Sequence, residues 1–182
     1  MNILLHTCCG PCSIYPVRIL RSEGLDVTGY YHRNNIHPLT ECIKREETLK
    51  TYSEDISLPL IIQKGYDLEG FIRNMAFREL ERCVVCYHER LMATAIIAKH
   101  GNFDAFSSTL LYSRYQKHDL LKSVGLSVAE KIGVEFLYRD FRSGWQEGVD
   151  ESRQREMYRQ PYCGCIYSEK ERYYKKLQKM DC

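Results

Sequence analysis

Short apolar runs alternate with longer segments of helical periodicity along most of this chain. Each run is four to six residues long and rich in Val, Ile, Leu, Tyr or Phe, which is typical of buried strands. Five strands are predicted in this way, at Ile3–His6, Val27–His32, Pro59–Gln63, Phe103–Ser108 and Val134–Tyr138.

Between these strands the apolar positions recur at helical spacing. Helices are predicted at Pro11–Glu23, Leu39–Asp55, Asp67–Met75 and Val84–His100, and on the face formed by Leu121, Val124, Val128 and Ile132. The tail from Asp150 has a helical but irregular pattern. Strand–helix alternation predicts an α/β fold, a mostly parallel sheet with helices on both faces. In such sheets the functional site lies at the carboxyl ends of the strands.

The length of 182 residues predicts one domain over residues 1–182. No apolar run approaches the roughly 20 residues of a membrane span, and the first residues do not resemble a signal peptide. We therefore expect a cytoplasmic protein that does not enter a membrane. The net charge of +2 is too small to indicate a nucleic-acid binder by itself.

The nine cysteines change this picture. A disulfide framework is not expected in a reducing compartment, and isolated cysteines such as Cys42 and Cys182 are typical of packed thiols. The other seven lie in three tight groups, which indicates metal binding. The groups are Cys8, Cys9 and Cys12; Cys83 and Cys86; and Cys163 and Cys165.

The first group follows the first predicted strand, at its carboxyl end. Because side chains alternate along an extended chain, we expect Cys8 and Cys9 to point to opposite faces. Pro11 suits the first position of a helix, so Cys12 should fall in the first helical turn, where a thiolate is favoured. The C-x-x-C form of Cys9-Gly-Pro-Cys12 is also compatible with a thiol–disulfide enzyme.

The second and third groups are a C-x-x-C at the start of a helix and a C-x-C around Gly164. These four cysteines could form a closed structural zinc site. That site would leave the first three cysteines unexplained, whereas all seven divide naturally into four ligands for a cubane cluster and three for a single metal with an open position. The segment 150–182 would then return to the sheet to supply its cysteines.

Six motifs, in this order, resemble the QueH-type epoxyqueuosine reductases. They are His6-Thr-Cys-Cys-Gly-Pro-Cys12, Asn35-Ile-His-Pro38, Arg82-Cys-Val-Val-Cys-Tyr-His-Glu-Arg-Leu91, Ser108-Thr-Leu-Leu-Tyr-Ser113, Asp140-Phe-Arg142 and Tyr158-Arg-Gln-Pro-Tyr-Cys-Gly-Cys-Ile-Tyr-Ser168. The chain departs from the family pattern at Arg33-Asn34-Asn35, where Asn-Pro-Asn is usual, and at Cys42, where a Tyr is common.

The resemblance implies a Rossmann-like fold and the reduction of epoxyqueuosine to queuosine at the wobble position of tRNA. It also implies a 4Fe–4S cluster beside one additional metal ion, iron or zinc, and an external low-potential electron donor. Our ligand hypothesis combines this with the expected divergence of Cys8 and Cys9. It assigns Cys9, Cys83, Cys86 and Cys163 to the cluster, and Cys8, Cys12 and Cys165 to the single metal.

Other roles are less constrained by the sequence. Asp140 and Tyr162 are candidate proton donors, and Arg82, Lys175 and Lys176 are candidate contacts to the anticodon loop of tRNA. One alternative is a zinc-stabilised RNA- or protein-binding module without catalysis. Another is an ATP-dependent RNA-thiolation enzyme, although cysteines occupy the turn where such enzymes carry a Ser-Gly-Gly-x-Asp-Ser loop.

Overall fold

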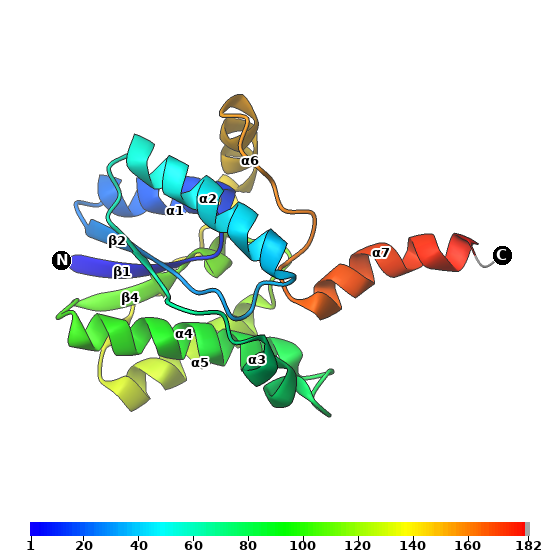
Figure 1. The fold of residues 1–182 in the computed structure, drawn as a ribbon. Helices are drawn as coiled ribbons and strands as arrows, with labels where there is room; N and C mark the ends of the chain where they lie inside the picture. Colours follow the sequence, from blue (N-terminus) through cyan, green and yellow to red (C-terminus); the bar gives the residue numbers. More distant parts are fainter. Residues whose placement is uncertain (181–182) are drawn as a thin grey trace.

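The computed structural model describes residues 1–180, which form a five-stranded sheet with helices on both faces (Figure 1). All four strand pairs are parallel and the strand order is β3-β2-β1-β4-β5. The strands are β1 (Asn2–Thr7), β2 (Asp26–Tyr31), β3 (Leu60–Ile62), β4 (Ala105–Ser108) and β5 (Glu135–Phe136). The predicted α/β, Rossmann-like architecture is confirmed.

The helices cover the sheet in two layers. α1 (Gly10–Ser22), α2 (Leu39–Asp55) and α6 (Trp145–Gln154) lie on one face in Figure 1, and α4 (Arg82–His100) and α5 (His118–Ile132) lie on the other. α3 (Leu68–Met75) precedes α4, and two short 3₁₀ helices, Thr109–Tyr112 and Arg142–Gly144, follow β4 and β5. No helix among residues 1–180 is long and apolar enough to cross a membrane.

The central strand β1 explains the arrangement. Ile3, Leu4 and Leu5 are fully buried, as expected of a parallel strand covered on both faces. β1 pairs with β2 on one side and with β4 on the other, so that Thr7 lies beside Tyr31 and His6 beside Ser108. The chain reverses its direction of strand addition between β1 and β4, and the residues that follow these two strands therefore meet at the switch point.

Two differences from the sequence expectation concern the second half of the chain. β5 spans only Glu135–Phe136, two residues of the predicted Val134–Tyr138 run. α6 begins at Trp145, five residues before the predicted helical tail. The sequence did not indicate this start because Gly144 and Gly148 weaken the helical pattern there. Both glycines allow close packing: a Cβ on Gly144 would lie 2.1 Å from the ring of Tyr15, and one on Gly148 would lie 2.3 Å from the Tyr112 hydroxyl.

The last helix, α7 (Ile166–Met180), has no buried residue and extends away from the body of the protein (Figure 1). Its start is nevertheless anchored. Arg82 of α4 forms an ion pair with Glu171, and its guanidinium lies 5.8 Å from the centre of the Tyr167 ring. The segment before α7 thus returns from α6 to the carboxyl edge of the sheet.

Candidate metal centre

Three thiols converge at the carboxyl end of β1. The sulfurs of Cys8, Cys9 and Cys12 all lie within 4.8 Å of one another and the three residues are buried. The Cys8 and Cys9 sulfurs are 3.8 Å apart. The prediction that these two side chains diverge is wrong, because β1 ends at Thr7 and the chain bends at Cys8 before α1 begins. Strand alternation therefore does not apply to this pair.

The start of α1 fixes this group. Cys9 occupies the position before the first helical residue, Pro11 lies in the first turn, and Cys12 follows within that turn as expected. The Ser13 hydroxyl donates to the Cys9 carbonyl at 2.8 Å. The three thiols are thus held by the local geometry of one strand-to-helix turn.

Hydrogen bonds among the three thiols shift their pKa values in opposite directions. The thiols of Cys12 and Cys9 donate toward Cys8 and lower its pKa, and the Thr109 hydroxyl adds a donor 3.4 Å from the Cys8 sulfur. The same bonds raise the pKa of Cys12, and burial raises the pKa of Cys9. A bound metal ion would favour the thiolate form of all three cysteines, because thiolates are its ligands.

The other four clustered cysteines come from α4 and from the segment before α7. Cys83 and Cys86 lie at the start of α4, and Cys163 and Cys165 flank Gly164, whose φ of +151° is unfavourable for other residues. Gln116 joins the two parts: its side-chain nitrogen donates to the Cys163 sulfur at 3.1 Å, and its oxygen accepts from the Tyr87 hydroxyl at 2.7 Å.

Two buried arginines contact these four cysteines or the backbone beside them. Arg90 Nε donates to the Cys86 sulfur at 3.3 Å, while burial raises the pKa of Cys86 to about 11. Arg45 of α2 donates to the Cys163 and Tyr162 carbonyls at 2.9 and 3.0 Å. Gly164 allows this approach, since a Cβ there would lie 3.3 Å from the Arg45 guanidinium.

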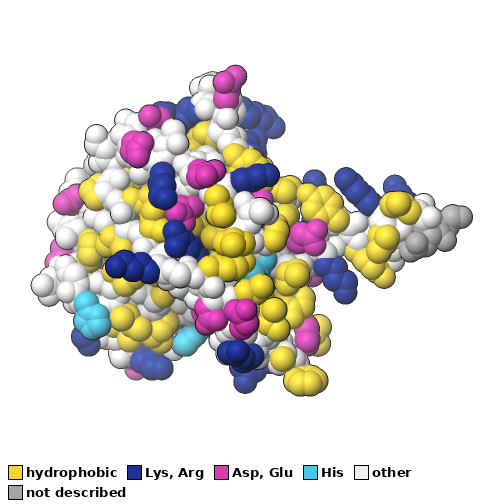
Figure 2. Space-filling view, viewed as in Figure 1, with side chains coloured by type: hydrophobic (Ala, Val, Ile, Leu, Met, Phe, Trp, Pro, Cys, Tyr) yellow, Lys and Arg dark blue, Asp and Glu magenta, His cyan; other side chains and the backbone are white. Residues whose placement is uncertain are grey.

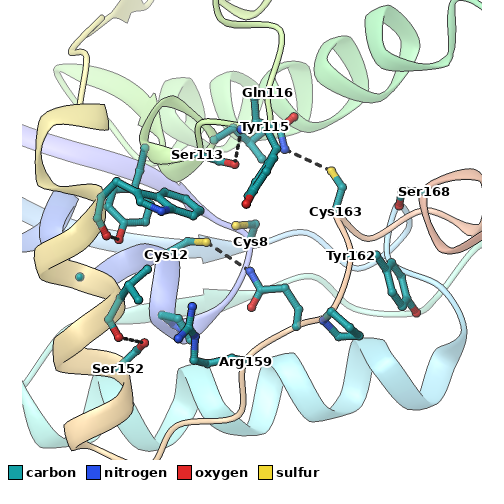
Figure 3. Close-up of a pocket in the computed structure, with 18 of the residues that line it drawn as sticks. Cys8, Cys12, Ser113, Tyr115, Gln116, Ser152, Arg159, Tyr162, Cys163 and Ser168 are labelled. Atoms are coloured by element: carbon teal, nitrogen blue, oxygen red, sulfur yellow. Dashed lines mark hydrogen bonds between the residues drawn. The ribbon is translucent and has the colours of Figure 1, made fainter. Parts of the chain in front are cut away.

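A pocket of about 600 Å³ opens onto the first thiol group. Cys8 and Cys12 contribute to its wall, and Gln160 donates to the Cys12 sulfur at 3.3 Å (Figure 3). Tyr112, Tyr115 and Trp145 form an aromatic side of the pocket, and Arg159, Gln160 and Pro161 also line it. Cys163, and Ser168, Glu171 and Arg172 at the start of α7, also line the pocket.

Neither candidate proton donor has a suitable setting. Asp140 is absent from the pocket wall and accepts hydrogen bonds from Arg142, which lower its pKa to about 2. Tyr162 lines the pocket, but its hydroxyl donates to the His37 carbonyl and points away from Cys8 and Cys12 in Figure 3. Burial raises the pKa of Tyr162 to about 12. The geometry does not favour proton donation by either residue.

The candidate RNA contacts lie around α7. Lys175 and Lys176 are exposed on this helix, and Figure 2 shows basic side chains along the part that projects from the body. Arg82 forms an ion pair with Glu171.

The sequence analysis missed the residues that surround the sulfurs, namely Arg90, Thr109, Gln116 and Gln160. Arg90, Thr109 and Gln160 lie inside the motifs quoted above, but only the folded chain brings them to their sulfurs.

Comparison with known proteins agrees with the cysteine pattern. A family model described as "Epoxyqueuosine reductase QueH" matches residues 3–171. The epoxyqueuosine reductase QueH of Dehalococcoides mccartyi is 34% identical over 172 residues, covering 94% of each chain. That of Thermotoga maritima is 32% identical over 181 residues, covering 94% of this chain and 92% of the relative.

A solved structure shows the same fold at low sequence identity. It is described as a predicted subunit of a tRNA methyltransferase from Methanocaldococcus jannaschii. The TM-score is 0.59 with 10% identity, over 84% of this chain and 74% of the other. This likeness supports the chain architecture alone.

Proposed function

This chain belongs to the epoxyqueuosine reductase QueH family, and we propose that it reduces epoxyqueuosine to queuosine at the wobble position of tRNA. The resemblance inferred from the cysteine motifs is thereby confirmed at the level of the family. In the proposed reaction both C–O bonds of the epoxide break and a carbon–carbon double bond forms. Two electrons and two protons are consumed, and the oxygen leaves as water.

The observation that carries this proposal is the convergence of three buried thiols beside a pocket. Sulfurs within 4.8 Å of one another suit a single ion, since each cysteine of a cubane cluster binds a different iron. We therefore revise the ligand hypothesis and assign Cys8, Cys9 and Cys12 to the single metal, iron or zinc. Cys9 leaves the cluster set and Cys165 enters it.

The remaining set, Cys83, Cys86, Cys163 and Cys165, offers the four thiolates that a 4Fe–4S cluster requires. Donors to sulfur support this assignment, because N–H groups of Arg90 and Gln116 already point at Cys86 and Cys163. Hydrogen bonds to sulfur are a normal part of the protein surroundings of such clusters.

When bound, the cluster would supply electrons singly at low potential and the single metal would supply Lewis acidity for cleavage of the epoxide. The chain's own residues would bind and orient the substrate. Gln160 and Thr109 fix the Cys12 and Cys8 sulfurs from two sides, while the aromatic side chains of the pocket exclude water from one flank. We propose an external low-potential electron donor, since no G-x-G-x-x-G loop follows β1.

The proposed partner is tRNA carrying epoxyqueuosine in its anticodon loop, which implies a cytoplasmic site of action. Arg172, Lys175, Lys176 and Lys179 follow i, i+3, i+4 and i+7 spacing on α7, so they share one face of the helix. Arg172 also lines the pocket. We propose Lys175 and Lys176 as phosphate contacts on this face, with Arg82 contributing beside the start of α7.

Incubation of the iron-loaded protein with epoxyqueuosine-containing tRNA tests this function. The reaction is run anaerobically with dithionite, and the digested nucleosides are analysed by mass spectrometry. The proposal predicts that epoxyqueuosine is replaced by a nucleoside lighter by one oxygen atom. Unchanged epoxyqueuosine with fully loaded protein would contradict it.

A further inference from the structure

Two aromatic rings of the pocket are not accounted for by metal binding. Trp145 and Tyr115 meet edge to face, with ring centres 5.6 Å apart and planes at 81°, and both line the pocket that contains Cys8 and Cys12. They come from separate elements, the start of α6 and the loop that follows the 3₁₀ helix after β4. The fold therefore brings them together at the switch point of the sheet.

Trp145 is held rigidly in place. Its ring lies 5.1 Å from that of Tyr112, and its carbonyl accepts a hydrogen bond from the Tyr112 hydroxyl at 2.9 Å. The small residues Gly144 and Gly148 let α6 approach Tyr15 and Tyr112 closely. Such a ring binds a planar ligand with little loss of side-chain freedom.

Tyr115, in contrast to Trp145, is largely exposed to solvent. It is 83% exposed, which is unusual for a large aromatic side chain beside a pocket, and its ring extends toward Cys8 in Figure 3. Arg159 lies on the other side of the thiols of Cys8 and Cys12 in the same view. Arg159 forms no ion pair with any residue between 1 and 180, so its guanidinium is available to a ligand.

We propose that Tyr115 and Trp145 form a stacking site for the fused-ring base of the substrate nucleotide, an inference that rests on the proposed function. Unpaired RNA bases are bound on aromatic rings and on arginine planes. The epoxide is carried on a substituent of the base, so the base lies at the mouth of the pocket while the substituent reaches Cys8 and Cys12. Tyr115 stacks on the base, Trp145 supports Tyr115, and Arg159 faces the base from the opposite side.

The test uses the metal-loaded protein and a synthetic anticodon stem–loop RNA with 2-aminopurine at the wobble position. Tyr115→Leu removes the ring, Tyr115→Phe retains it, and Tyr174→Leu removes an exposed tyrosine from α7 as a control. Because Tyr115 is exposed, none of these changes disturbs the core. Binding is measured by anisotropy and stacking by quenching of the 2-aminopurine fluorescence.

Loss of one base–aromatic stack is expected to weaken binding by about 5-fold to about 150-fold in Tyr115→Leu. The bound RNA should also be brighter with this variant, while Tyr115→Phe and Tyr174→Leu stay within about two-fold of the wild type. Wild-type affinity in Tyr115→Leu, or an equal loss in Tyr115→Phe, overturns the stacking site alone if the wild type still reduces tRNA. A wild type that neither binds this RNA nor reduces epoxyqueuosine-containing tRNA overturns the proposed function as well.

Discussion

Arg90 Nε donates a hydrogen bond to the Cys86 sulfur across 3.3 Å, and no carboxylate within residues 1–180 forms an ion pair with this buried arginine. Its other contacts are the Asn35 carbonyl at 3.1 Å and a His6 ring nitrogen at 3.3 Å. A buried positive charge requires a negative partner. The thiolates of the proposed cluster supply it.

Replacing Arg90 with Met should therefore lower the reduction potential of the cluster. The guanidinium stabilises the more negative, reduced state, so its removal disfavours reduction, by about 60 mV if the interaction is worth tenfold in a one-electron equilibrium. Anaerobic redox titration of the variant measures this shift. Lys99→Met, at the far end of α4, removes the same charge and should leave the potential unchanged. Equal potentials in Arg90→Met and wild type would exclude this role for Arg90.

The division of the seven cysteines is tested by two reciprocal substitutions. Cys9→Ala should retain the absorbance of the cluster but lose about one metal ion per chain and its turnover, because the single metal needs all three neighbouring thiolates. Cys165→Ala should lose the cluster absorbance. Metal analysis and anaerobic absorption spectroscopy report both.

Cys42→Ala is the matched control for these cysteine variants. Cys42 is buried beside Tyr31, whose hydroxyl lies 3.6 Å from its sulfur and donates to its carbonyl. We expect this variant to keep both metals and to lose only about 1–2 kcal/mol of stability. Loss of cluster absorbance in Cys9→Ala, with retention in Cys165→Ala, would restore the division first expected from the sequence.

The revised assignment of Cys9 and Cys165 illustrates what the sequence could and could not determine. The apolar runs identified all five strands, most clearly β1 and β4, which are almost wholly buried within a parallel sheet. The spacing of the cysteines also located the group formed by Cys8, Cys9 and Cys12. The orientation of Cys8 and Cys9 depended on the bend of the chain at Cys8, which periodicity does not resolve. Contacts such as Gln160 to Cys12 span 148 positions and follow only from the folded chain.

Neutralising Lys175 and Lys176 on α7 should weaken tRNA binding in a salt-dependent manner. If each contacts one phosphate of the anticodon loop, the double Gln variant lowers the slope of log affinity against log salt by about 1.4. Titrations at several salt concentrations measure this slope. Lys99→Gln with Lys131→Gln changes the net charge equally near the ends of α4 and α5, and an identical loss in that control would rule out a specific contact.

Buried histidines should make the protein sensitive to mild acid. Burial lowers the pKa of His32 to about 3 and that of His37 to about 4. Below pH about 6.5 the unfolded chain binds protons that the folded chain cannot, so stability falls by up to about 1.4 kcal/mol per pH unit for each histidine. The stability that depends on these neutral rings is complete above pH about 6.5 and declines toward pH 4.

His37→Leu should reduce this pH dependence. Urea unfolding at intervals between pH 7.5 and about 4.5 should show a slope smaller by about 1.4 kcal/mol per pH unit than in the wild type. The exposed His100 provides the control, since His100→Leu should keep the wild-type slope. Parallel curves for His37→Leu and wild type would show that His37 is not held neutral by the fold.

We propose that seven cysteines hold an iron–sulfur cluster and a separate metal around one pocket. Metal analysis with absorption and electron paramagnetic resonance spectroscopy on protein purified anaerobically from iron-replete cells tests this arrangement. We predict a brown protein with about four cluster irons and one further metal ion per chain, and a cluster signal on reduction. A colourless protein that contains only zinc would contradict this and indicate a zinc-stabilised binding module without catalysis.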